Sequence, residues 1–132
     1  MKKQPVSPRV FVVDDDPEFL NLAATLLELE GYQVDRFENP QLAYQAFCAA
    51  EPRPAALVSD CKMAPWTGEE LAERCRQVNP RLGVLLISGF VLEAAGEQYP
   101  VADAFLTKPF LAETYLATVA AVLTKQELEP AR

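Results

Sequence analysis

Short apolar runs alternate with longer segments of helical period along most of the chain. The run RVFVV at residues 9–13 is continuous and β-branched, and residues 17–30 repeat apolar side chains at helical spacing. The same succession recurs four more times. Further strands are predicted at residues 32–37, 55–59, 83–88 and 103–107, and further helices at residues 40–50, 68–78, 89–100 and 110–124.

Two of these segments have weaker patterns than the rest. Residues 32–37 alternate apolar and polar side chains, which is typical of a strand at the edge of a sheet. The segment 89–100 contains Gly96 and ends at Pro100, so it predicts a short helix that is the best candidate for movement. Residues 125–132 are expected to form a frayed tail.

Five strand–helix units in 132 residues predict one α/β domain. Parallel strands require crossover connections, and the helices in these crossovers cover both faces of the sheet. We therefore predict a doubly wound parallel sheet. Ligands of such sheets bind beyond the carboxyl ends of the strands, so the residues at those ends are the candidates for chemistry.

Composition narrows the function classes. The formal net charge of −7 disfavours direct binding to nucleic acid, whose phosphates are held by clustered Lys and Arg. No apolar stretch approaches the roughly 20 residues of a membrane span and no signal core follows the basic start, so a cytoplasmic protein is expected. The chain has no histidine, which excludes catalytic triads and histidine-ligated metals. Cys48, Cys61 and Cys75 are predicted to be buried thiols rather than a disulfide framework.

Polar side chains stand at the carboxyl ends of four predicted strands. Asp14 and Asp15 follow the first strand and Asp60 follows the third, whereas Ser88 and Lys108 stand at the ends of the fourth and fifth. Carboxylates beside a hydroxyl and an amine suit Mg²⁺ next to a phosphoryl group. Asp16 precedes Pro17 and suits a helix N-cap. Taken singly, each of these residues is equally compatible with a solvated loop charge, a turn hydroxyl or a surface lysine.

Together these motifs resemble the response-regulator receiver domain of two-component signalling. The resemblance rests on VVDD, on an Asp 45 residues after Asp15 in SDCKM, and on ISG and KPF, and it covers residues 9–124. It implies a flavodoxin-like fold with five helices and the strand order 2-1-3-4-5. Residues 1–8 then form an N-terminal extension and residues 125–132 the tail.

The resemblance also implies a role for each site residue. Asp60 is the phosphoacceptor, Asp15 a direct Mg²⁺ ligand, Asp14 acts near the metal, and Lys62 contributes its backbone carbonyl. Ser88 and Lys108 contact the phosphoryl oxygens. Phe105 is implied as the aromatic side chain that changes rotamer on activation, although its place in an apolar strand is equally typical of a core residue.

The implied function is that of a stand-alone, chemotaxis-regulator-like receiver rather than a conventional enzyme. A histidine kinase or histidine phosphotransfer protein is its phosphodonor. Its downstream protein target, or a second copy of the chain, binds the face made by the fourth helix, the fifth strand and the fifth helix. The alternatives are a pseudo-receiver scaffold that is not phosphorylated, an aspartyl-phosphate phosphatase, and a flavin-binding carrier. The last would need a phosphate-binding loop where this chain has carboxylates.

The chain departs from the family pattern after Met63. The proline expected next is displaced by one position, which gives Ala64 and then Pro65, while Gly68 keeps its distance from Asp60. Because proline fixes φ and lacks an N–H, the geometry of this loop is expected to differ. Phe90, two residues after Ser88, places a ring where water approaches Asp60, which predicts slow loss of the phosphoryl group.

Overall fold

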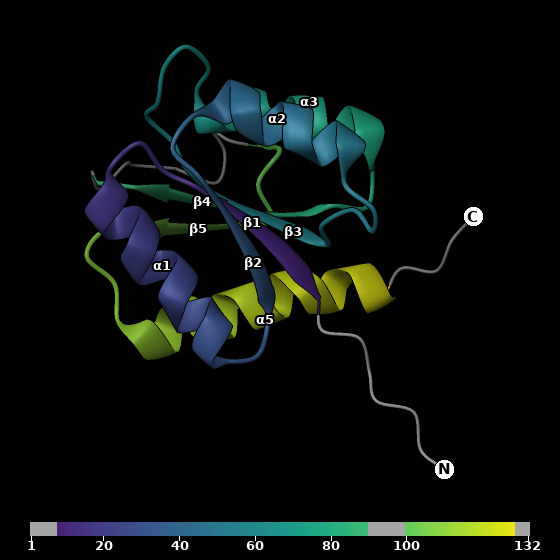
Figure 1. The fold of residues 1–132 in the computed structure, drawn as a ribbon. Helices are drawn as coiled ribbons and strands as arrows, with labels where there is room; N and C mark the ends of the chain where they lie inside the picture. Colours follow the sequence, from purple (N-terminus) through teal and green to yellow (C-terminus); the bar gives the residue numbers. More distant parts are fainter. Residues whose placement is uncertain (1–7, 90–99, 129–132) are drawn as a thin grey trace.

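The computed structural model describes residues 8–89 and 100–128. Its centre is a five-stranded parallel sheet (Figure 1). The strands are β1 (Arg9–Val13), β2 (Gln33–Phe37), β3 (Ala56–Asp60), β4 (Gly83–Ser88) and β5 (Ala104–Thr107), in the order β2-β1-β3-β4-β5. This order confirms the predicted topology and places β2 at an edge, as its alternating pattern indicates.

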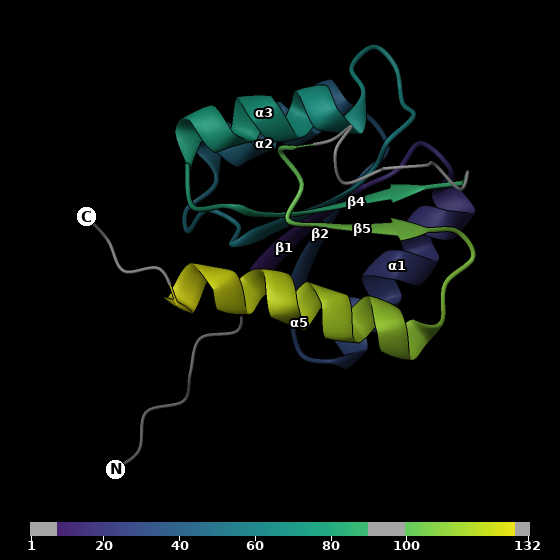
Figure 2. The same cartoon turned by 180° about the vertical axis from the view of Figure 1, so that it is seen from behind.

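Helices cover both faces of the sheet. They are α1 (Pro17–Leu29), α2 (Pro40–Ala49), α3 (Gly68–Val78) and α5 (Ala112–Leu128). α2 and α3 lie on one face, and α1 and α5 lie on the other (Figures 1 and 2). Local signals start three of these helices: Asp16 and Asn39 are N-caps followed by proline, and Thr67 forms a capping box with Glu70.

Two hydrophobic cores separate the three layers. Val10 and Val12 of β1 pack with Leu27 of α1 and Val119 of α5 on one side of the sheet. Phe11 and Val13 pack with side chains of α2 and α3 on the other. The central strands are therefore buried almost throughout, because both of their faces are covered: every residue of β3 and β4 is buried, and so is every residue of β1 after Arg9.

The boundaries of the described elements lie within one residue of the predicted ones, except in α5. β3 includes Asp60 as its last residue. α5 begins at Ala112 instead of residue 110 and continues to Leu128, so residues 125–128 are helical rather than part of a frayed tail, in keeping with the high helix propensity of Lys, Gln, Glu and Leu. The helix predicted within residues 89–100, including Phe90, lies outside the described residues.

The three cysteines differ in burial. Cys61 and Cys75 are buried as predicted, but Cys48 is exposed, because it lies on the outer side of α2 rather than toward the sheet.

Among the described residues, no helix combines the length and the apolar character that a membrane span requires.

Candidate functional site

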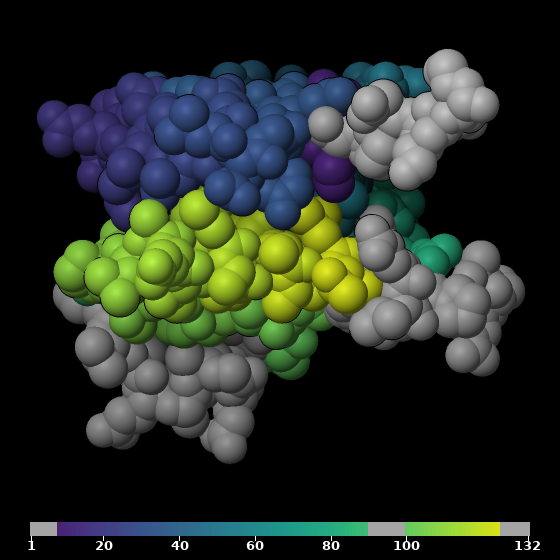
Figure 3. Space-filling model, turned by 90° about the horizontal axis from the view of Figure 1, so that it is seen from below, coloured from purple at the N-terminus to yellow at the C-terminus, as the bar shows by residue number. Residues whose placement is uncertain are grey.

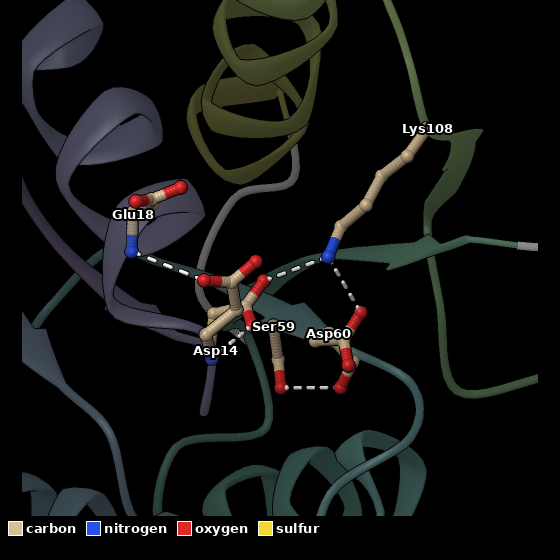
Figure 4. Close-up of polar contacts among 6 residues, drawn as sticks. Asp14, Glu18, Ser59, Asp60 and Lys108 are labelled. Carbon is tan, nitrogen blue, oxygen red and sulfur yellow. Dashed lines mark hydrogen bonds and ion pairs between the residues drawn. The ribbon is translucent and has the colours of Figure 1, made fainter.

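Lys108 connects the carboxyl ends of two central strands. Its Nζ lies 3.1 Å from Oδ2 of Asp14, which follows β1, and 3.3 Å from Oδ1 of Asp60, which ends β3 (Figure 4). Residues 94 positions apart in the chain thus meet at one edge of the sheet. The structure brings together the acidic pair, Asp60 and the lysine, which the sequence predicted to meet at the strand ends.

Backbone hydrogen bonds hold both carboxylates in place. The N–H of Asp14 donates to the carbonyl of Phe37 at 3.0 Å, and the Asp14 side chain accepts from the N–H of Asp16 at 2.9 Å. Directly after Asp60, the N–H of Cys61 donates to the carbonyl of Ile87 at 2.8 Å. Asp14 and Asp60 are only 3% and 8% exposed, so they are fixed where the sheet ends.

Asp14, Asp15 and Asp60 form an acidic cluster. Each offers a carboxylate oxygen, and these three oxygens lie within 4.8 Å of one another. Asp15 is exposed, so the cluster opens to solvent on its side. When all three are ionised, Lys108 balances one of the three negative charges, and a divalent cation with oxygen ligands fits the two that remain.

The surroundings of Asp14, Asp60 and Lys108 raise the pKa of all three side chains. Burial raises the pKa of Asp60, and the negative charge of Asp14 raises it further. Burial likewise raises the pKa of Asp14, against the opposing effects of the Asp16 N–H and of Lys108. Burial alone would lower the pKa of Lys108, but its hydrogen bonds and charge interactions with Asp14 and Asp60 raise it overall. The ammonium is therefore held in its charged form.

The other predicted residues lie around this cluster. Ser88 ends β4 and is 1% exposed, and its carbonyl accepts from the N–H of Lys108 at 2.7 Å. Lys62 is exposed in the loop after β3. Phe105 of β5 is half-buried and packs on the core beneath α3, with Leu86 opposite it in β4. This placement puts Phe105 in the core and leaves its switch role a prediction.

The loop between β3 and α3 packs closely at Gly68. A Cβ on Gly68 would overlap the carbonyl oxygen of Asp60, and the Gly68 N–H donates to the carbonyl of Cys61 at 3.0 Å. The Ala64–Pro65 peptide bond at the displaced proline is cis. Trp66 lies between the ring of Tyr44 in α2 and the guanidinium of Arg74 in α3, 5.8 Å and 4.1 Å from its own ring centroid.

One contact of the site was not predicted from the sequence. Phe19, in the first turns of α1, presents its ring to Lys108, with Nζ 4.0 Å from the ring centroid. In the sequence Phe19 is an apolar residue at the start of a helix, and no local signal distinguishes it from a core residue. Only the tertiary structure, which brings the start of α1 next to the segment after β5, reveals the contact.

Comparison with known proteins agrees with this geometry. Residues 10–120 match the response regulator receiver domain family. The chain is 32% identical over 107 residues to the response regulator receiver protein CpdR of Brucella abortus, covering 77% of this chain and 85% of CpdR. It is also 32% identical over 126 residues to the response regulator MprA of Mycobacterium ulcerans, covering 94% of this chain but 53% of MprA.

Solved structures share the fold. A CheY-like receiver domain from Methanospirillum hungatei has a TM-score of 0.85 at 24% identity, covering 95% of this chain and all of that one. The beryllofluoride-activated receiver domain dimer of NtrC4 has a TM-score of 0.81 at 26% identity, covering 89% and 98%. The family match, the CpdR relative and the fold agree: this chain belongs to the response regulator receiver domain family of two-component signalling.

Proposed function

We propose that this receiver accepts a phosphoryl group on Asp60 from a phosphohistidine donor in a Mg²⁺-dependent reaction. The observation that carries the proposal is the position of the Lys108 ammonium between Asp14 and Asp60, next to a cluster of three carboxylates. A histidine kinase or a histidine phosphotransfer protein supplies the donor, because the chain has no histidine of its own.

The acidic cluster holds the metal. Asp15 and Asp60 would supply direct carboxylate ligands, Asp14 would act beside them, and the backbone carbonyl of Lys62 would complete the protein's share. The excess of negative charge in the cluster supports this assignment, because three carboxylates share one lysine ammonium. When bound, Mg²⁺ offsets the charge of the phosphoryl oxygens and of the attacking carboxylate.

The chemistry is a direct transfer between two residues. A carboxylate oxygen of Asp60 forms a bond to phosphorus while the bond from phosphorus to the donor's imidazole nitrogen breaks, and the electron pair of that bond stays on the imidazole. The product is an acyl phosphate. Lys108 pairs with the phosphoryl oxygens, and the Ser88 hydroxyl donates a hydrogen bond to one of them. Both residues therefore stabilise the negative charge on the phosphoryl oxygens during the transfer.

Phosphorylation then changes a surface. We infer that Ser88 moves toward the phosphoryl oxygens and that Phe105 turns into the space it leaves. The surface that responds consists of the segment before β5, β5 itself and α5, and it binds the downstream protein or a second copy of the chain. The dimer named in the NtrC4 structure supports the second possibility. A stand-alone organisation and a cytoplasmic location stay predictions.

The test is intact mass after incubation with Mg²⁺ and a small acyl phosphate. We expect one phosphoryl adduct in the parent, none in Asp60→Asn, and a strongly reduced yield in Asp15→Asn. Asp16→Asn is the matched control. It changes the third carboxylate of the same stretch but keeps an N-cap, so its adduct should equal the parent's.

Three outcomes would contradict the proposal or part of it. A parent that takes up neither a phosphoryl group nor beryllofluoride would favour the pseudo-receiver alternative, which the displaced Pro65 supports. Steady hydrolysis of a generic phosphomonoester would favour the phosphatase alternative. The absence of Mg²⁺ dependence would remove the assigned role of the acidic cluster.

A further inference from the structure

A ring of α1 covers the lysine of the site. Phe19 is half-buried, and its ring centroid lies 4.0 Å from Nζ of Lys108. The same ammonium contacts carboxylate oxygens of Asp14 at 3.1 Å and Asp60 at 3.3 Å. Three elements, α1, β1 and β3, therefore contribute one contact each to a single ammonium group.

The ring is itself fixed by a chain of aromatic contacts. Phe110 meets Phe19 edge to face, with centroids 5.5 Å apart, and stacks on Tyr115 of α5 at 4.8 Å. The hydroxyl of Tyr115 donates to the carbonyl of Ala23 in α1 at 3.0 Å. Figure 3 shows α1 and α5 side by side on this face of the molecule. The position of Phe19 is thus set by the packing of α1 against α5.

A ring suits this position for a physical reason. Lysine carries its charge on a flexible four-carbon stem, so an ammonium that must meet two carboxylates needs support from another side. The face of an aromatic ring attracts a cation without accepting its N–H groups as a carboxylate does. The ammonium therefore keeps its hydrogen-bond donors for Asp14, Asp60 and any oxygens bound between them.

We propose that Phe19 is a positioning residue for phosphoryl transfer, and that its ring holds the Lys108 ammonium where it meets both carboxylates and the incoming phosphoryl oxygens. This inference rests on the proposed function of Asp60. It adds a role for a residue of α1 that touches neither the phosphoryl group nor the metal ligands but acts through Lys108.

The first test compares ring removal with ring retention. Phe19→Leu keeps an apolar side chain but loses the π face, whereas Phe19→Tyr keeps the ring. We expect the rate of adduct formation with Mg²⁺ and acetyl phosphate to fall about threefold to thirtyfold in Phe19→Leu and to stay within twofold of the parent in Phe19→Tyr. Phe47→Leu removes a ring from the opposite core and is the matched control: it should lose stability but keep the parent's rate.

The second test isolates the pair. If Phe19 acts through Lys108, Phe19→Leu should change beryllofluoride binding, followed by Trp66 fluorescence, in the parent but not in a Lys108→Ala background. A direct readout needs neither metal nor donor: the Lys108 Hε protons should show an upfield ring-current shift by NMR that is lost in Phe19→Leu and kept in Phe19→Tyr.

The outcomes are distinguishable. Equal rates in Phe19→Leu and the parent, or an effect of equal size in the Lys108→Ala background, would overturn the role of Phe19 while leaving Asp60 as phosphoacceptor. The absence of a ring-current shift in the parent would overturn the contact itself. A parent that is never phosphorylated would overturn the proposed function instead, whatever the NMR result.

Discussion

At the scale of single residues, the three cysteines separate by environment. Cys48 is exposed on α2, whereas Cys61 and Cys75 are buried. Burial, with the nearby charge of Asp60, raises the pKa of Cys61 to about 12, and burial raises that of Cys75 to about 12. A thiol reacts as its thiolate, so Cys61 is an inert neighbour of Asp60 rather than a redox handle.

This difference predicts selective alkylation. At pH 8 about one in ten thousand Cys61 and Cys75 thiols is ionised when the pKa is near 12, and raising the pH to 9 increases that fraction only tenfold. Iodoacetamide should therefore add one label to the native protein at either pH and three in urea, as measured by intact mass. Cys48→Ser should remove the native label. Rapid labelling of Cys61 in the folded protein would contradict its burial.

At the scale of elements, the start of α3 is packed against the end of β3. The close approach of Gly68 to the Asp60 carbonyl leaves no room for a side chain. The N–H of Gly68 also closes the loop onto Cys61. The position of Asp60 in the site therefore depends on a helix that contributes no side chain to it.

Gly68→Ala should consequently disturb both stability and chemistry. Relieving the overlap requires α3 or the end of β3 to move, so we expect a loss of about 1–3 kcal/mol in the free energy of unfolding by urea titration. The rate of Asp60 phosphorylation should fall as well. Gly89→Ala is the control, because a Cβ there meets no atom of the described residues within 4 Å. An unchanged urea midpoint in Gly68→Ala would show that the junction adapts at little cost.

At the scale of the whole molecule, the ionised acidic cluster lowers the free energy of unfolding. The chain carries a net charge of −7, and the sheet gathers three carboxylates at one end. Burial raises the folded-state pKa of Asp14 and Asp60 above the unfolded value of 3.8, so ionisation of these groups lowers stability as the pH rises through that range. The acidic cluster therefore destabilises the fold, and its place in the protein is explained by its proposed function.

Neutralising this cluster should stabilise the protein. In the absence of Mg²⁺ we expect Asp60→Asn to raise the free energy of unfolding at pH 7 by about 0.5–2 kcal/mol, which urea titration measures. In the parent, Mg²⁺ at ten times its Kd should add about 1.4 kcal/mol, and this gain should shrink in Asp60→Asn. A variant less stable than the parent would mean that the ion pair with Lys108 outweighs the repulsion.

The local structure and the polar residues at the strand ends follow from the sequence alone. Apolar periodicity and caps such as Asp16 and Asn39 are local signals, so the strands and most helix boundaries follow from them. The polar residues at strand ends were found because parallel strands deliver their carboxyl ends to one edge. The end of α5 was missed because the apolar pattern weakens after residue 124, whereas Lys, Gln, Glu and Leu have high helix propensity.

Which side chains touch depends instead on the tertiary packing. Phe19 contacts Lys108, and Gly68 contacts the Asp60 backbone, because strand register and helix packing bring distant residues together. The exposure of Cys48 likewise depends on how α2 is rotated against the sheet. Periodicity along a chain describes which face a residue shares with its neighbours, whereas a contact between residues far apart is created by the packing of whole elements.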